Sequence, residues 1–442
     1  MRLLPYLAAF LIAAPATAQT APPAPVGPQP AQADPAFQTR LDGLIAILNG
    51  GGDYAGYFTP AFQAQVPQAT FQAVTAQLIA GNGKPLKILS VAQETPWRAN
   101  VRVQYEKAIA NVLLVADPVA PHQVGGLLVR GFESAEKTLP AVESAFAALP
   151  GEVGYAIAKL GTDKPQLLAG RNADRPYAIG SAFKLVILAE LVRVTNAGER
   201  KWDDLVTLDG GMLPGGVYAQ KPRGTQVTLR ELATQMISIS DNSATDILLH
   251  TLGRKKVEAM MPMLGIADPA RNRPFLGTLD LFRLKGVAGL AGRYLALDEA
   301  GRRALLDGEV ATIPPILIDV TSFTRKVPNR IDTLEWFESP NDLVRVMDWL
   351  RRHTEGPAGA EARKVLSVNP GVSPDVRAKW QWIGYKGGSE PGVMNMTLLL
   401  QAQNGDWYVV TGSWNDVQKA VDEGRFASLI GKAAELTAPP AR

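Results

Sequence analysis

The sequence places a serine and a lysine at a spacing suited to nucleophilic catalysis: Ser181-Ala182-Phe183-Lys184, at the start of a long apolar run. A serine hydroxyl is a poor nucleophile at neutral pH and needs a nearby base. Because residues i and i+3 share one helix face, Lys184 is predicted to touch Ser181. The helix N-terminus adds backbone N–H groups that stabilise an oxyanion. The same spacing in Ser134 to Lys137 precedes no apolar helix, and we interpret that segment as a solvated connector.

A second polar element, Ser240-Asp241-Asn242, interrupts two apolar helical patterns at 229–237 and 244–252. A polar loop between buried helices is costly unless its groups are paired. One interpretation is that Ser240 and Asp241 only cap the second helix. The other, which is compatible with capping, is that Ser240 relays a proton.

A third element, Lys386-Gly387-Gly388-Ser389, follows Trp382 to Tyr385 on a predicted strand. Glycines at a strand edge let a substrate approach the backbone closely, and the lysine attracts a carboxylate. Lys159-Leu160-Gly161 has the same spacing but lies upstream of Ser181, so the order of the elements selects Lys386.

Composition excludes several other classes of function. The chain has no cysteine, which excludes cysteine nucleophiles, cysteine metal sites and disulfides. Its three histidines, His122, His250 and His353, lack the spacing of metal ligands, so we expect no metal or other cofactor. A formal charge of +3 without a dense basic run makes nucleic acid an unexpected partner. The expected partner is a small-molecule substrate.

The first residues have the pattern of a secretory signal peptide, residues 1–18: Arg2, an apolar run at 3–14, and Ala16-Thr17-Ala18. The run is shorter than the roughly 20 residues of a spanning helix. We therefore expect a secreted or periplasmic protein without a membrane span after cleavage. Residues 19–33 are rich in Pro and Ala and predict an extended linker. The oligomeric state is left open.

The rest of the chain predicts an α+β protein of two domains. Residues 34–135 show helical periodicity followed by short alternating strands. Residues 139–438 begin with a helix and two strands, continue with a mainly helical middle, and end with a hairpin around Asn404-Gly405 and a helix at 417–435. Such a pattern predicts an antiparallel sheet built from both ends of the domain, with a helical subdomain.

Three resemblances follow from these elements. The order of helices and strands at 34–135, with Asp53 to Phe58, resembles the cone-shaped domains of steroid isomerases and nuclear transport factor 2. The three catalytic elements, in their order, resemble class A β-lactamases and penicillin-binding proteins with their transpeptidase-like fold. The pairing of both domains, with Leu334 to Phe337, is similar to the lactamase-like esterases of clavulanic-acid clusters.

The resemblance implies that Ser181 forms an acyl-enzyme and that Lys184 acts as its base. Ser240 would pass a proton to the leaving nitrogen. Asn242 would hold the substrate's side-chain amide, and Lys386 would tune Ser240 and pair with the substrate carboxylate.

The resemblance implies two further roles. The N–H groups of Ser181 and Ser389 would form the oxyanion hole. Gly388, together with Asn242 and Ser389, would bind the substrate.

Two departures from the family pattern limit what the resemblance implies. Gly387 replaces the usual hydroxyl residue between the lysine and the glycine, so one hydrogen bond to a carboxylate is missing unless Ser389 supplies it. The omega-loop glutamate that activates the deacylating water is absent, because its expected position falls at Phe323 or Thr324. The nearest carboxylates are Asp319, Glu335 and Glu338, and Glu335 is interpreted as a structural partner in its loop.

Three hypotheses follow. The first is a β-lactam hydrolase with slow or narrow turnover, in which Lys184 and Ser240 also activate water. The second is an esterase or D-alanyl peptidase for another acyl substrate. The third is a penicillin-binding module that is acylated without turnover. The segment 283–315 is longer than in a compact class A enzyme and is interpreted as a possible lid.

Overall fold

The computed structural model describes residues 33–440, which divide into two compact units. One unit extends to Lys137 and the other begins at Thr138. The predicted signal peptide, and all of the predicted linker except Ala33, lie outside the described residues. Each unit combines helices and strands, which confirms the predicted α+β class. No helix of the described segment is long and apolar enough to cross a membrane.

The first unit packs helices against an antiparallel four-stranded sheet of order β1-β2-β3-β4. Its helices and strands are α1 (Pro35–Leu48), α2 (Tyr54–Tyr57), α3 (Pro60–Gln65), α4 (Gln68–Asn82), β1 (Pro85–Thr95), β2 (Arg98–Tyr105), β3 (Ala108–Ala116) and β4 (Val124–Ser134). Alternate residues of β2, from Ala99 to Tyr105, are buried against α1 because side chains alternate between the faces of a strand. The likeness of this unit to an isomerase-like domain stays a prediction.

The sheet of the second unit is antiparallel, with the order β11-β12-β13-β5-β6. It therefore brings the two ends of the unit together, as predicted. Its strands are β5 (Glu152–Leu160), β6 (Gln166–Arg171), β11 (Trp382–Glu390), β12 (Val393–Gln401) and β13 (Trp407–Asn415). Two-stranded ribbons pair β7 (Tyr177–Ala178) with β10 (Phe337–Glu338) and β8 (Leu205–Thr207) with β9 (Gln226–Thr228).

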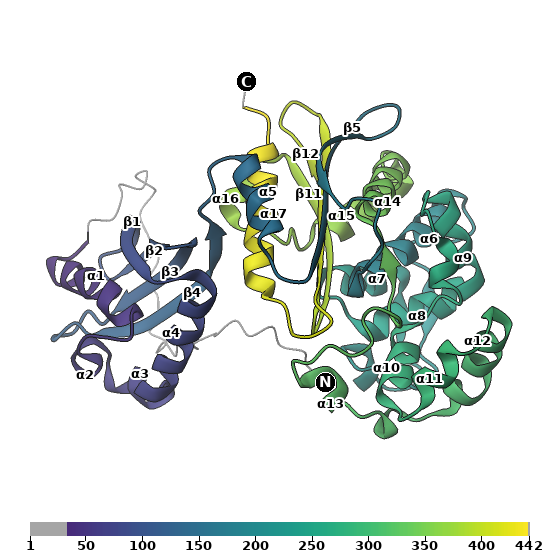
Figure 1. The fold of residues 1–442 in the computed structure, drawn as a ribbon, viewed down its shortest axis with the longest axis horizontal. Coiled ribbons are helices and arrows are strands. Elements are labelled where there is room, and N and C mark those ends of the chain that lie inside the picture. The colour runs from purple at the N-terminus through teal and green to yellow at the C-terminus, as the bar shows by residue number, and fades with distance from the viewer. Residues whose placement is uncertain (1–32, 441–442) are drawn as a thin grey trace, which may run out of the picture. The chain divides into compact units, whose positions relative to one another are not determined.

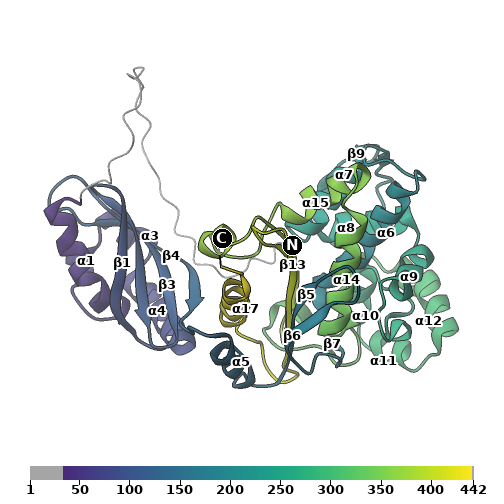
Figure 2. The same ribbon diagram turned by 90° about the horizontal axis from the view of Figure 1, so that it is seen from above.

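Helices cover both faces of this sheet (Figures 1 and 2). Terminal helices α5 (Leu139–Ala147) and α17 (Glu423–Thr437) cover one face, where they meet alternate β5 residues such as Tyr155. The opposite face packs against the helical subdomain through residues such as Ala156. The main helices of this subdomain are α6 (Lys184–Asn196), α7 (Leu229–Ser238), α8 (Asn242–Leu252), α9 (Arg254–Met263), α10 (Thr278–Gly286), α11 (Leu290–Leu295), α12 (Glu299–Leu305) and α14 (Pro340–His353).

Shorter helices complete the second unit. They are α13 (Thr321–Thr324), α15 (Ala360–Ser367) and α16 (Pro374–Ala378).

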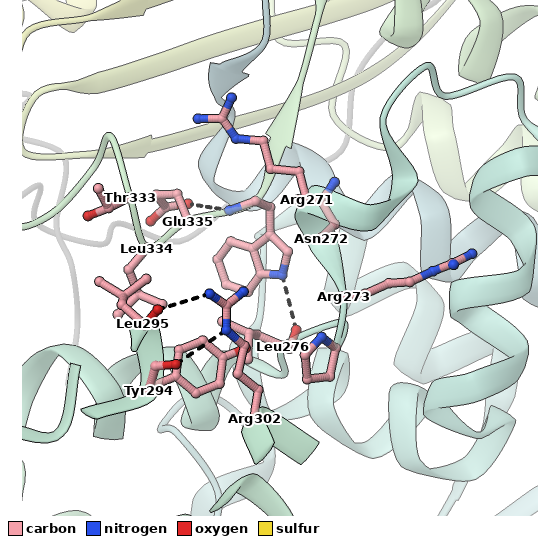
Figure 3. Close-up of a pocket in the computed structure, with 12 residues that line it drawn as sticks. Arg271, Asn272, Arg273, Leu276, Tyr294, Leu295, Arg302, Thr333, Leu334 and Glu335 are labelled. Atoms are coloured by element: carbon pink, nitrogen blue, oxygen red, sulfur yellow. Dashed lines mark hydrogen bonds between the residues drawn. The ribbon is translucent and has the colours of Figure 1, made fainter. Parts of the chain in front are cut away.

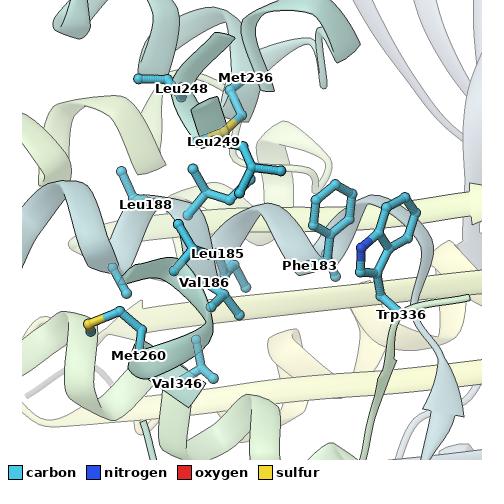
Figure 4. Packing of buried hydrophobic residues seen from close by; sticks show 14 of the residues in the cluster. Phe183, Leu185, Val186, Leu188, Met236, Leu248, Leu249, Met260, Trp336 and Val346 are labelled. Carbon is cyan, nitrogen blue, oxygen red and sulfur yellow. The ribbon is translucent and has the colours of Figure 1, made fainter. Parts of the chain in front are cut away.

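Helix α6 is the centre of the subdomain core (Figure 4). Its residues from Lys184 to Val192 are all buried, which is the pattern of a helix surrounded by protein on every side. Leu185, Val186 and Leu188 pack against side chains of α7, α8, α9 and α14. The first residue of this helix is therefore held at a fixed place in a rigid core.

Several local predictions are wrong. The edge strand β1 was not predicted, and much of it is exposed. Helix α17 begins at Glu423, not near 417, because Asp422 caps it by accepting a hydrogen bond from the Arg425 amide. Ser134, in the predicted solvated connector, is fully buried at the end of β4.

The first part of the possible lid belongs to the core of the structure. Helix α10, which begins just ahead of the long segment and ends inside it, belongs to the core, with Leu281 and Leu284 buried. Because these side chains pack in the interior, α10 has no free position from which to open and close.

Candidate active site

Ser181 lies in a tight turn, the 3₁₀ helix Gly180–Phe183, immediately before α6. Two contacts fix the chain that enters this turn. The Asn415 amide binds both backbone groups of Ala178, at 2.9 and 3.0 Å. The Ile179 amide donates to the Trp336 carbonyl at 3.0 Å.

The exit from the turn is fixed by an aromatic pair. The rings of Phe183 and Trp336 stack with centroids 3.7 Å apart (Figure 4). The Trp336 indole also donates to the Leu276 carbonyl at 3.1 Å. The position of Ser181 is thus set by packing on both sides of the turn.

In the second polar element, Asp241 caps a helix and Ser240 does not. Asp241 caps α8 by accepting from the Ala244 amide at 2.7 Å, and its other oxygen accepts from the Val217 amide at 2.6 Å. Ser240 has a φ of +60°, in the left-handed region that costs a residue with a side chain about 1–3 kcal/mol. Its hydroxyl does not cap α8 and instead contacts Lys184 and Lys386. This residue is held in a strained conformation at the point where the chemistry is expected.

Lys184 is fully buried and donates to three oxygens. Its ammonium lies 2.7 Å from the Ser240 carbonyl, 3.0 Å from the Ser240 hydroxyl and 2.8 Å from Asn242 Oδ1. The predicted contact with Ser181 is not a hydrogen bond here: within residues 33–440, the Ser181 hydroxyl has no hydrogen bond to Lys184 or Ser240. Without substrate, catalytic hydrogen bonds are often long and shorten only in the complex.

Lys386 approaches the same hydroxyl from the sheet. Its ammonium lies 3.1 Å from Ser240 Oγ and also donates to the Gly387 carbonyl. Burial lowers the pKa of Lys386 to about 7. Burial, and then the nearby Lys386 charge, hold the pKa of Lys184 well below its usual range. Lys184 is thus favoured as a neutral base, and Lys386 gains or loses its proton close to neutral pH.

The strand β11 lies directly against the turn Gly180–Phe183, which contains the candidate nucleophile Ser181 and is called the nucleophile turn below. A Cβ built on Gly388 would lie only 2.2 Å from the Ser181 nitrogen, so no side chain fits at this position. On the turn side, a Cβ on Gly180 would lie 3.1 Å from the Ser389 nitrogen. The backbone N–H groups predicted for the oxyanion hole therefore belong to two segments in close contact.

The position at which the resemblance predicts a carboxylate-binding hydroxyl is Gly387. A Cβ built on Gly387 would lie 2.3 Å from the Tyr385 hydroxyl, so the Tyr385 phenol lies where a residue 387 side chain would project. The Ser389 side chain opposes the rise in the Glu423 pKa that burial causes, so it faces Glu423 on α17. Glu423 therefore competes with a substrate carboxylate for the Ser389 hydroxyl.

The predicted position of an omega-loop base contains no base. Phe323 packs in a small apolar cluster with Leu279 and Ile318. Glu335 pairs with Lys285 at 2.9 Å and accepts from the Trp336 amide at 3.1 Å, in agreement with its interpretation as a structural partner.

Sequence reasoning missed Lys285 and Glu390. Lys285 on α10 also pairs with Glu390 at 2.6 Å, at the end of β11. The even spacing of Lys386, Gly388 and Glu390 puts all three on one strand face. That spacing was the available signal for Glu390, whereas the partner Lys285, far away in sequence, had none.

Comparisons with known proteins agree with this arrangement. The family described as "Beta-lactamase enzyme family" matches residues 135–434. Beta-lactamase 1 of Streptomyces cacaoi is 34% identical over 131 residues, which are 27% of this chain and 38% of that protein. The match thus spans less than half of that relative's length.

Solved structures are similar over about two thirds of the chain. A β-lactamase of Sphaerobacter thermophilus is 22% identical, with a TM-score of 0.46 over 68% of this chain and 98% of that one. A putative class A β-lactamase, PenP of Rhodopseudomonas palustris, is 16% identical, with a TM-score of 0.47 over 68% and 97%. The family match covers more than half of the sequence. The chain belongs to the β-lactamase enzyme family and is a serine hydrolase of that kind.

Proposed function

We propose that this protein hydrolyses β-lactams through an acyl-enzyme on Ser181, with slow or narrow turnover. The observation that carries the proposal is the hydroxyl of Ser240, which contacts Lys184 at 3.0 Å and Lys386 at 3.1 Å. A hydroxyl between a neutral and a charged lysine can receive and donate a proton. This arrangement lies beside a serine whose backbone is fixed in a rigid turn.

The proposed acylation uses these groups in sequence. Lys184, with its lowered pKa, accepts the Ser181 proton as the hydroxyl attacks the lactam carbonyl. The oxyanion is bound by the N–H groups of Ser181 and Ser389. Ser240 then donates its proton to the leaving nitrogen and is reprotonated from Lys184. Lys386 pairs with the substrate carboxylate, and Asn242 accepts from the lysine while its NH₂ group binds the acyl side chain.

The altered carboxylate position supports a restricted substrate range. Gly387 offers no hydroxyl, and the Ser389 hydroxyl faces the Glu423 carboxylate, which competes with a substrate carboxylate for it. A substrate without a carboxylate loses less binding free energy at such a site than a penicillin does. This observation favours, as the second candidate, an esterase that uses the same nucleophile. A D-alanyl peptidase remains an alternative that the observation does not favour, because its substrate ends in a carboxylate.

Steady-state hydrolysis tests the proposal. The full chain is assayed with penicillin G and a chromogenic cephalosporin, beside Ser181→Ala and the control Ser144→Ala, an exposed serine on α5. We expect hydrolysis by the wild type and the control, and none above background by Ser181→Ala. If neither lactam is consumed but an aryl ester or a D-alanyl peptide is, in a Ser181-dependent manner, the second candidate holds. A lactam that is bound covalently and never released supports the third hypothesis, a penicillin-binding module.

We propose further that residues 1–18 direct export, which gives a secreted or periplasmic enzyme. N-terminal sequencing of the protein recovered from a secreting host tests this. Cleavage after Ala18 is expected, and recovery of an intact N-terminus would contradict it.

A further inference from the structure

A buried charge cluster lies beside the nucleophile turn and has no part in the acylation steps. It consists of Lys285, Glu335 and Glu390, with Lys285 Nζ 2.9 Å from Glu335 and 2.6 Å from Glu390. The side chains of Lys285 and Glu335 are 0% and 1% exposed, whereas that of Glu390 is 16% exposed. Glu390 is thus the member of the cluster that solvent reaches.

The strand direction places Glu390 close to Ser181. Lys386, Gly388 and Glu390 project from one face of β11 because side chains alternate along a strand. On this face, Lys386 reaches Ser240 and Gly388 lies against the Ser181 nitrogen. Glu390 leaves the strand about 7 Å beyond Gly388. One glutamate side chain and one water molecule span that distance.

The other carboxylate, Glu335, is linked to the turn through its neighbour Trp336. Glu335 precedes Trp336, whose carbonyl accepts from Ile179 in the chain that enters the turn. Glu335 and Trp336 also line a cavity of about 30 Å³ with Arg271 and Arg302 (Figure 3). A polar cavity of that volume is large enough for a water molecule.

The cluster contains two carboxyl groups and one ammonium. Burial, and then the nearby Glu335 carboxylate, raise the pKa of Glu390 to about 8. Burial alone would lower the pKa of Lys285, but the two glutamates outweigh it and raise that pKa, so Lys285 stays charged. The pKa of Glu390 therefore lies close to neutral pH, where a general base is most effective.

We propose that Glu390 is the general base that activates water for hydrolysis of the acyl-enzyme, in place of the omega-loop glutamate. The inference rests on the proposed acyl-enzyme on Ser181. The Glu390 carboxylate takes one proton from a water molecule while the water oxygen bonds to the ester carbonyl carbon. The tetrahedral intermediate collapses, the bond from that carbon to Ser181 Oγ breaks, and Oγ takes up the proton that Glu390 removed from the water. The released acid gives its remaining proton to solvent and leaves as its carboxylate, and Glu390 is again a carboxylate.

Separate measurement of acylation and deacylation tests this proposal. Quenched-flow intact-mass measurements with a chromogenic cephalosporin give both rates for the wild type, Glu390→Gln and the control Glu152→Gln. Glu152 is an exposed glutamate paired with Arg175. Removal of a general base costs about 10²–10⁴ in rate, so we expect Glu390→Gln to deacylate about 100-fold more slowly while its acylation rate stays near that of the wild type. The control behaves as the wild type.

The outcome is decided by the ratio of the two effects. A deacylation rate that falls at least about tenfold more than the acylation rate supports a base, whereas equal losses overturn the proposal in favour of a structural role. If Glu390→Gln does not fold, Glu390→Asp is judged by the same ratio. A wild type that forms no adduct with any donor contradicts the proposed function itself. A wild type and a Glu390→Gln variant that deacylate equally contradict only this inference.

Discussion

The contact between Gly388 and the nucleophile turn provides a direct test of the oxyanion geometry. In Gly388→Ala, the new Cβ would lie 2.2 Å from the Ser181 nitrogen and 2.3 Å from the Ile179 carbonyl oxygen. Ordinary contacts of this kind begin near 3.4 Å, so the strand and the turn must separate by about 1 Å. A displacement of about 1 Å at a reacting centre costs roughly 100-fold in rate. Overpacking of this kind also costs about 1–3 kcal/mol of folding free energy.

The assay separates the two effects. The acylation rate with a chromogenic cephalosporin is measured beside urea denaturation of the same preparation. Gly161→Ala is the matched control, because a Cβ at Gly161 meets no atom within 4 Å. We expect acylation by Gly388→Ala to fall about 100-fold while most of the protein stays folded. An acylation rate within about threefold of the wild type would refute the role given to this contact.

Three further predictions concern the groups around the site. Because the pKa of Lys386 is about 7, its positive charge is lost as the pH rises through 7, and KM for a penicillin should rise over the same range. Lys386→Arg stays protonated and should show no such rise in KM. Asp241→Ala removes a helix cap and leaves the Val217 amide unpaired; urea denaturation should show a loss of about 1–3 kcal/mol, and Asp241→Asn should show less. Trp336→Ala removes a buried ring stacked beside the nucleophile turn and should cost about 3–5 kcal/mol in the same measurement; a smaller loss than 1 kcal/mol would contradict the packing described.

The sequence predicts best those elements whose signals are local. The apolar run from Phe183 to Val194 predicts a buried helix, and α6 covers Lys184–Asn196. The Asn404-Gly405 turn predicts the hairpin of β12 and β13, in which Gly405 has a φ of +88°. Both elements are determined by residues that are close together in the sequence, so a local pattern predicts them.

Other elements have no clear local pattern and cannot be predicted from the sequence in this way. The edge strand β1 has an exposed and irregular pattern, with Leu86 and Leu89 turned to solvent, and so shows no clean alternation. The start of α17 is set by one cap at Asp422, which composition does not mark.

The same distinction holds in the site. The types and order of Ser181, Ser240 and Lys386 predict the lysine-to-serine contacts. The direction of the Lys184 ammonium, toward Ser240 and not Ser181, depends on how α6 and α8 pack. The ion pair of Lys285 with Glu390 joins residues 105 positions apart, and no sequence spacing encodes it.

Peptide mapping of a trapped adduct tests the central claim most directly. The full chain is mixed with penicillin G, quenched in acid at times from milliseconds to hours, digested, and analysed by mass spectrometry. We predict a mass increase of one penicillin on the peptide that contains Ser181, which decays with time and is absent in Ser181→Ala. An adduct on another residue, or an adduct that persists in Ser181→Ala, would contradict the assignment of Ser181 as the nucleophile.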